Sequence, residues 1–146
     1  MRMAASLICL SITSYMHAQV TPAQPQPTVV VSGDFDRPSG HPECEGEEGA
    51  ERERCTAEVV LREVKARIPE APAGWESYED MGIRFDVNAF GNITGIVVES
   101  MEDQVIHQAV VTTLYALPKF IPARKDGKGM GSRYELRYPM RLVFGE

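Results

Sequence analysis

The sequence predicts an α+β domain in which two helices pack on one face of a three-stranded antiparallel sheet. Residues 133–144 alternate apolar and polar side chains over twelve positions, which is the period of a β-strand. Residues 83–87 also alternate, and residues 93–99, which are rich in β-branched side chains, follow a Phe90-Gly91-Asn92 turn, so the two segments predict a hairpin. Segments with apolar residues at helical spacing precede and follow this hairpin, so the predicted order is helix, strand, strand, helix, strand.

Length and composition are those of one soluble globular domain with tails. The chain has 146 residues, of which 43% are hydrophobic and 25% charged. Its formal net charge of −6 argues against a nucleic-acid partner or an anionic membrane surface. Residues 43–53 are acidic and residues 119–141 mostly basic, which we interpret as two solvated faces, although the basic one could meet an acidic partner.

The N-terminal residues predict an export signal and a linker. Residues 1–18 begin with Arg2, continue with an apolar run and end at Ala18, a plausible cleavage point. The run is shorter than the roughly 20 residues that a membrane anchor needs, so we expect cleavage. Residues 19–42 contain five prolines and predict a flexible tether. The folded domain is then expected over residues 43–146.

Two cysteines, Cys44 and Cys55, remain after the predicted cleavage, because Cys9 is removed with the signal. An even pair in an oxidising compartment predicts a disulfide, worth about 3 kcal/mol for a loop of this size. Zinc would need two further ligands, and His41 and His107 lie at no common metal-site spacing. We therefore expect no metal and no cofactor.

Local signals place the helix ends. The first helix is predicted to start at Thr56 as N-cap and to stop at Pro69. The second is predicted from Ser100, with Asp103 in a capping-box position, to Pro118. Its expected buried stripe comprises Val105, Ile106, Ala109, Val110, Thr113, Leu114 and Leu117.

No catalytic constellation is recognisable, so we expect that the protein is not an enzyme. Neither His41 nor His107 has the neighbours of a Ser-His-Asp arrangement, and catalysis by His107 is the weakest of the alternatives. The glycine-rich run at residues 127–131 precedes a strand, whereas a phosphate-binding loop follows a strand and opens a helix.

The last predicted strand suggests a binding role. Pro139 has no N–H to donate, which favours an edge strand. An edge can pair with an extended segment of a partner or with a second copy of the chain. The arginines and Pro139 could instead protect the edge from such pairing. On the first interpretation the partner-binding residues are Arg137, Tyr138, Met140, Arg141 and Val143.

Four segments resemble the C-terminal domain of TonB-family energy transducers, in the form found in Bacteroidetes-type bacteria. They are residues 85–93, 117–123, 126–128 and 138–144, and the cysteine pair before the first helix is also similar. The resemblance covers residues 43–144 and implies two helices against a three-stranded sheet. Family members of this kind cross the inner membrane once, reach through the periplasm on a Pro-rich linker, and pair an edge strand with the TonB box of an outer-membrane receptor to transmit the proton-motive force.

Carried onto this sequence, the resemblance implies that the final strand is the pairing edge. The basic residues near it would be Lys119, Arg124, Lys125 and Lys128. The short N-terminal run, the short tether and the missing Tyr-Pro-x-x-Ala pattern depart from a transducer. We therefore expect an exported periplasmic TonB-C-like domain that binds an outer-membrane receptor or another envelope protein. The alternative is an energy transducer for TonB-dependent transport, held at the inner membrane by an uncleaved signal.

Overall fold

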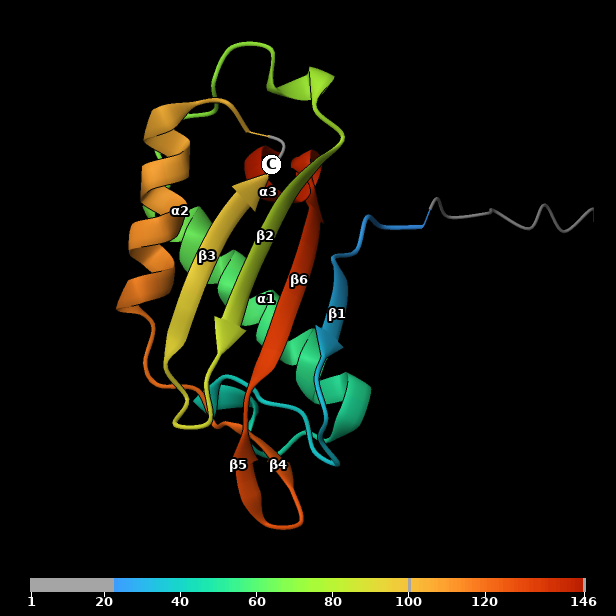
Figure 1. Ribbon diagram of the computed structural model, residues 1–146. Helices are drawn as coiled ribbons and strands as arrows, with labels where there is room; N and C mark the ends of the chain where they lie inside the picture. The colour runs from blue at the N-terminus through green and yellow to red at the C-terminus, as the bar shows by residue number, and fades with distance from the viewer. Residues whose placement is uncertain (1–22, 100, 146) are drawn as a thin grey trace, which may run out of the picture.

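The computed structural model describes residues 23–99 and 101–145, so the predicted signal, residues 19–22 of the tether and Ser100 lie outside the described residues. The architecture is α+β. A four-stranded antiparallel sheet carries helices on one face, and a two-stranded hairpin extends from one end (Figure 1). The sheet order is β1-β6-β2-β3, formed by β1 (Thr28–Ser32), β6 (Ser132–Pro139), β2 (Asp80–Val87) and β3 (Ile93–Glu99).

The predicted order of helix, strand, strand, helix, strand is confirmed by α1 (Gly49–Arg67), β2, β3, α2 (Gln104–Ala116) and β6. The structure adds β1, the hairpin β4 (Ala123–Lys125) and β5 (Lys128–Met130), and a short helix α3 (Met140–Phe144). In Figure 1, α1 passes behind the sheet and α2 lies at its left, beside β3, and no helix covers the face toward the viewer.

Helix α1 begins earlier than predicted. It starts at Gly49, so the predicted N-cap Thr56 is a buried residue inside the helix, where its hydroxyl accepts a hydrogen bond from the His41 N–H at 3.1 Å. The acidic residues 43–53 were predicted to form a solvated face. However, Arg52 is only 1% exposed, because its guanidinium donates to the carbonyl oxygens of Glu45 and Glu47, both at 2.8 Å.

Helix α2 also differs from the prediction at its start. Asp103 is the N-cap and accepts hydrogen bonds from the N–H groups of Val105 and Ile106. The helix therefore begins three residues later than a Ser100 cap would place it. Val105, predicted to be buried, is 64% exposed, because the core-facing stripe begins at Ile106.

One apolar core fills the space between the helices and the sheet. Ala57, Val60 and Val64 of α1 and Ile106, Val110 and Leu114 of α2 meet alternate side chains of the strands. The aromatic rings of Phe85 and Tyr134 stack with centroids 5.1 Å apart, and Phe120 meets both edge-on. Trp75 and Tyr78 are partly buried and pack at the border of this core.

The long terminal strand was predicted to run to Phe144, and this is wrong. The strand ends at Pro139, and Met140–Phe144 form helix α3. Met140 and Val143 are three residues apart, so one helical turn buries both of them against the core. An alternating pattern cannot distinguish this arrangement from a longer strand.

The predicted flexible tether also differs from the structure between Thr28 and Pro42. Residues 28–32 form β1, and Gly40 exchanges backbone hydrogen bonds with Ile121 at 3.0 and 2.9 Å. Ser39 and His41 are buried. The folded unit therefore begins fifteen residues before the predicted boundary at Glu43. The predicted disulfide is confirmed, and it joins Cys44, which precedes α1, to Cys55 within α1.

Candidate functional site

Strand β6 is an internal strand, which corrects the prediction that the final strand lies at an edge. On one side it pairs with β2, and on the other with β1, in register from Thr28 opposite Arg137 to Ser32 opposite Arg133. Pro139 is accommodated because it is the last residue of the strand, beyond the reach of β1. The two outer strands of the sheet are β1 and β3.

The predicted partner-binding residues do not form one surface. Arg137 and Arg141 are exposed, whereas Tyr138, Met140 and Val143 are at most 3% exposed. The Tyr138 hydroxyl donates to the carbonyl oxygen of Ala57 at 2.7 Å, and burial raises its pKa well above the ordinary tyrosine value. These three buried side chains support the core, so a partner in contact with the folded domain does not meet them.

The predicted basic residues lie at the other end of β6 from α3. Arg124, Lys125 and Lys128 belong to the β4–β5 hairpin, which extends from the end of the sheet where β6 begins, and Lys119 lies in the preceding loop (Figure 1). The Arg124 guanidinium donates to the Gly127 carbonyl oxygen at 3.1 Å. Lys125 forms an ion pair with Asp34. The hairpin therefore fastens the chain that follows β1 and does not extend the surface around Arg141.

The β3 edge is interrupted. Opposite Phe85 of β2, strand β3 places two residues, Gly95 and Ile96, and the register shifts there. Gly95 has a φ of +62°, the left-handed conformation of a bulge in which glycine is favoured. A bulge of this kind twists the strand and disturbs the row of backbone groups, which protects an edge from pairing.

The β1 edge lacks these protections. Its sequence, Thr-Val-Val-Val-Ser, contains no charge and no proline, and its five residues pair with β6 without a register shift. Val30 is 52% exposed. Uncharged β-branched residues at an even edge are the composition that favours addition of another strand. The sequence signal for this strand is the Val29-Val30-Val31 run, which lies within the predicted tether.

The face of the sheet opposite the helices is charged. Arg133 forms two hydrogen bonds to the Asp86 carboxylate, at 2.7 and 3.2 Å, and they hold the pKa of Asp86 below its ordinary value. Glu99 lies 3.5 Å from Arg84 and 4.0 Å from Arg137. Glu135, at the centre of β6 on the same face, forms no ion pair within the part of the chain that the structure describes.

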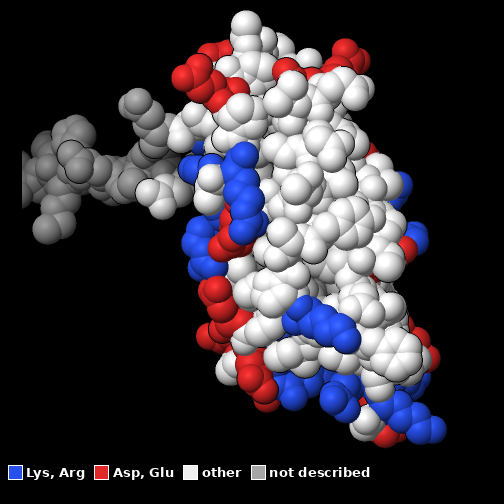
Figure 2. Space-filling model, turned by 90° about the vertical axis from the view of Figure 1, so that its left-hand side faces the viewer, with Lys and Arg blue, Asp and Glu red and all other residues white. Residues whose placement is uncertain are grey.

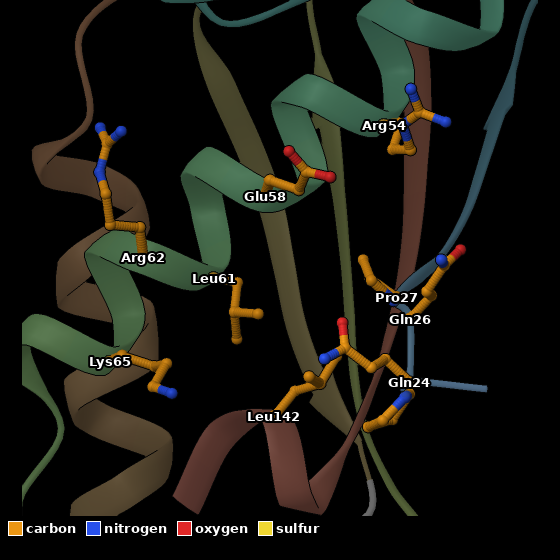
Figure 3. A pocket seen from close by; sticks show the side chains of 10 residues that line it. Gln24, Gln26, Pro27, Arg54, Glu58, Leu61, Arg62, Lys65 and Leu142 are labelled. Atoms are coloured by element: carbon orange, nitrogen blue, oxygen red, sulfur yellow. The ribbon is translucent and has the colours of Figure 1, made fainter. Parts of the chain in front are cut away.

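A hollow of about 700 Å³ lies between α1 and the segment that leads into β1 (Figure 3). Its apolar part is formed by Leu61 and Leu142. Polar and charged side chains surround it, from Gln24 and Gln26 on one side and from α1 on the other, where they are Arg54, Glu58, Arg62 and Lys65. Arg62 is engaged by Glu43, at 2.8 and 3.0 Å. The hollow separates the N-terminal end of β1 from the helix beneath it.

The surface over α2 is of another kind. Helix α2 contains no Lys, Arg, Asp or Glu, and Figure 2 shows a wide region without charge on this side of the molecule. Val105 and Tyr115 are 64% and 61% exposed. This surface is uncharged and partly apolar, but its helix contributes no backbone groups to a partner strand, because they are bonded within the helix.

No group of three His, Cys, Asp or Glu side chains within residues 23–99 and 101–145 could hold a metal ion. Among the helices of these same residues, none is sufficiently long and apolar to cross a membrane. Comparison with protein-family models, with curated proteins and with solved structures finds no match to this chain.

Proposed function

We propose that the chain is an exported periplasmic interaction domain, similar to the TonB C-terminal domain, that pairs a strand of its sheet with an extended segment of an outer-membrane receptor or another envelope protein. The observation that carries the proposal is the difference between the two sheet edges. The β3 edge is interrupted by the Gly95 bulge, whereas the β1 side is uncharged, regular and open. Main-chain pairing at such an edge supplies affinity, and alternate side chains supply selectivity.

The arrangement of elements supports the same proposal. Helices lie on one face of an antiparallel sheet in the order that the sequence resemblance implies, and a disulfide joins Cys44, which precedes the first helix, to Cys55 within it. The final strand differs from what the resemblance implies, because it is not at an edge of the sheet. Since β1 covers Arg133–Arg137 of the final strand, a partner must either add outside β1 or take its place.

Hydrogen exchange in the presence of receptor peptides tests the proposal. Synthetic peptides that carry the TonB boxes of outer-membrane receptors of the native host would be added to the intact oxidised protein. We expect at least one of them to alter amide exchange in β1, slowing it if the peptide adds outside β1 and accelerating it if the peptide takes the place of β1, and to leave β3 unchanged. A peptide of the same composition in scrambled order is the control. If no peptide alters exchange on the β1 side of the sheet, the proposal is wrong.

Energy transduction by an anchored form is the competing function, favoured by the resemblance in sequence. Fractionation of the native host followed by intact-mass measurement separates the two. A periplasmic protein that starts at Gln19 supports the exported domain. A full-length protein in the inner-membrane fraction supports the transducer, because only an anchored chain can be coupled to an inner-membrane motor.

A further inference from the structure

Strand β1 is fixed at its C-terminal end. The N–H groups of Asp36 and Arg37 both donate to the Arg124 carbonyl oxygen, at 2.8 and 3.1 Å, and Gly40 exchanges hydrogen bonds with Ile121. Lys125 adds an ion pair to Asp34. The chain that follows β1 is therefore attached to the rest of the fold at several points within ten residues.

The N-terminal end of β1 is attached much less firmly. Residues 23–26 are exposed, and Pro27 is half-buried. The hollow described above lies between these residues and α1, as Figure 3 shows. The strand can therefore separate from β6 at Thr28 while its other end stays attached.

The side chains of β1 attach it less firmly than those of the inner strands. Val29 and Val31 are half-buried, whereas Leu136 and Tyr134, which lie opposite them on β6, are 1% and 0% exposed. Within the described residues, no side chain of β1 forms a hydrogen bond or an ion pair. The backbone ladder and the partial packing of Val29 and Val31 against the core hold the strand, and another extended segment with similar side chains can form equivalent contacts.

We infer that β1 can be displaced from β6, and that the binding partner is an extended segment that takes its place antiparallel to β6. This segment carries β-branched apolar residues at the positions of Val29 and Val31 and a basic residue at the position of Val30. This rests on the proposed function and specifies its partner. The alternating apolar positions follow from the inward direction of Val29 and Val31. The basic residue follows from Glu135, which lies directly opposite Val30 on the solvent face.

A partner segment needs a favourable contact that β1 lacks, because β1 belongs to the same chain as β6. An attached strand competes at a high effective concentration, so a free segment with identical contacts binds weakly. On the side of β2, Glu135 lies opposite Arg84, whereas on the side of β1, Val30 offers it no opposite charge. A segment with Lys or Arg at this position gains a cross-strand pair that β1 lacks, and this gain makes the exchange selective.

The first experiment tests the predicted charge preference. The probe is a fluorescein-labelled peptide with the sequence of residues 24–34 carrying Val30→Lys, and its matched control carries Val30→Asp. With the intact oxidised protein, fluorescence anisotropy should show the Lys peptide binding about two- to fivefold more tightly, the size of an exposed cross-strand pair. In a Glu135→Lys protein the preference should reverse. Equal binding of the two peptides would overturn the assignment of a basic residue.

The second experiment tests displacement itself. Thr28 and Arg137 are directly opposed on the solvent face, so Thr28→Cys with Arg137→Cys should form a disulfide that locks the free end of β1. We expect the locked protein to bind the Lys peptide at least about tenfold more weakly than the two alkylated single-cysteine variants. A Val29→Ser, Val31→Ser protein, whose own strand is weakened, should bind it about tenfold more tightly.

The outcomes separate this inference from the proposed function. If the locked protein binds as tightly as its controls, the segment adds outside β1, and displacement is wrong although strand pairing stands. If receptor peptides slow exchange but the peptides of residues 24–34 bind no variant, displacement is again wrong. A third outcome is that the peptides of residues 24–34 bind the Val29→Ser, Val31→Ser protein and not the disulfide-locked protein, while no receptor peptide alters exchange. Displacement is then supported, and the proposed receptor partner is wrong.

Discussion

Arg52 is a buried cation whose charge is compensated by backbone carbonyl oxygens. Its side chain is 1% exposed and passes beside Gly40, where any Cβ would lie 2.8 Å from the Arg52 Cγ. Its guanidinium holds the loop that contains Glu45 and Glu47. One residue therefore joins the disulfide loop, helix α1 and the chain that leads from β1.

Replacing Arg52 should destabilise the fold. We expect Arg52→Met to lower the free energy of unfolding by about 2–4 kcal/mol, because two charge-assisted hydrogen bonds are lost and two carbonyl groups lose their partners. Arg54→Met is the matched control, since Arg54 and its partner Glu51 are both 56% exposed, and it should change stability by less than about 0.5 kcal/mol. Urea denaturation measures both. If both variants lost the same free energy of unfolding, the buried hydrogen bonds of Arg52 would not stabilise the fold more than the exposed ion pair of Arg54 does.

His41 gives the stability a dependence on pH. Burial lowers its pKa below the ordinary value of 6.5, and nearby Arg62 acts in the same direction, while Glu43 and Glu63 oppose it. The unfolded chain therefore takes up a proton near pH 6.5 that the folded protein still excludes, so the free energy of unfolding falls as the pH decreases below 6.5.

His41→Asn should reduce this dependence between pH 6.5 and pH 5. Asn has no titrating group and retains an acceptor for the Glu43 N–H, which the His41 Nδ1 accepts at 3.2 Å. Urea denaturation across this range, with the natural protein in parallel, measures the difference in slope. An identical slope in both proteins would contradict the assignment to His41.

The Cys44–Cys55 disulfide acts at the level of an element. It closes a loop with a sequence separation of 11 and fixes the first turns of α1 beside the chain that follows β1. We expect Cys44→Ser with Cys55→Ser to lower the free energy of unfolding by about 3 kcal/mol. Reductant should destabilise the natural protein similarly in urea denaturation and leave the double variant unchanged. A reductant effect on the double variant would point to another cause.

The elements that sequence predicts well are those whose pattern is local. The 83–99 hairpin and both long helices are marked by periodicity and by prolines, and the structure contains them. The start of α1 was missed because helix propensity alone cannot show that Arg52 finds carbonyl partners in a disulfide loop. The internal position of β6 was missed because β1 lies about one hundred residues earlier, and pairing at that distance leaves no periodic signal.

At the scale of the whole molecule, stability is unevenly distributed. Strand β2 and the centre of β6 lie between paired neighbours and fully buried side chains, whereas β1 has one open side and half-buried valines. Native-state hydrogen exchange should show that the backbone amides of β1 open with a free energy several kcal/mol lower than those of β2, without global unfolding. Equal opening free energies would mean that the sheet opens only as one unit.

The bulge at Gly95 has a consequence for how many molecules can associate. A sheet with two receptive edges adds copies at both and grows into a fibre. Within the described residues, one edge is interrupted and the other pairs with no further strand, so the proposed strand pairing would use a single edge of each molecule. If two copies joined through their β1 edges, only the interrupted edges would face outward, and we would expect the assembly to stop at a symmetric pair.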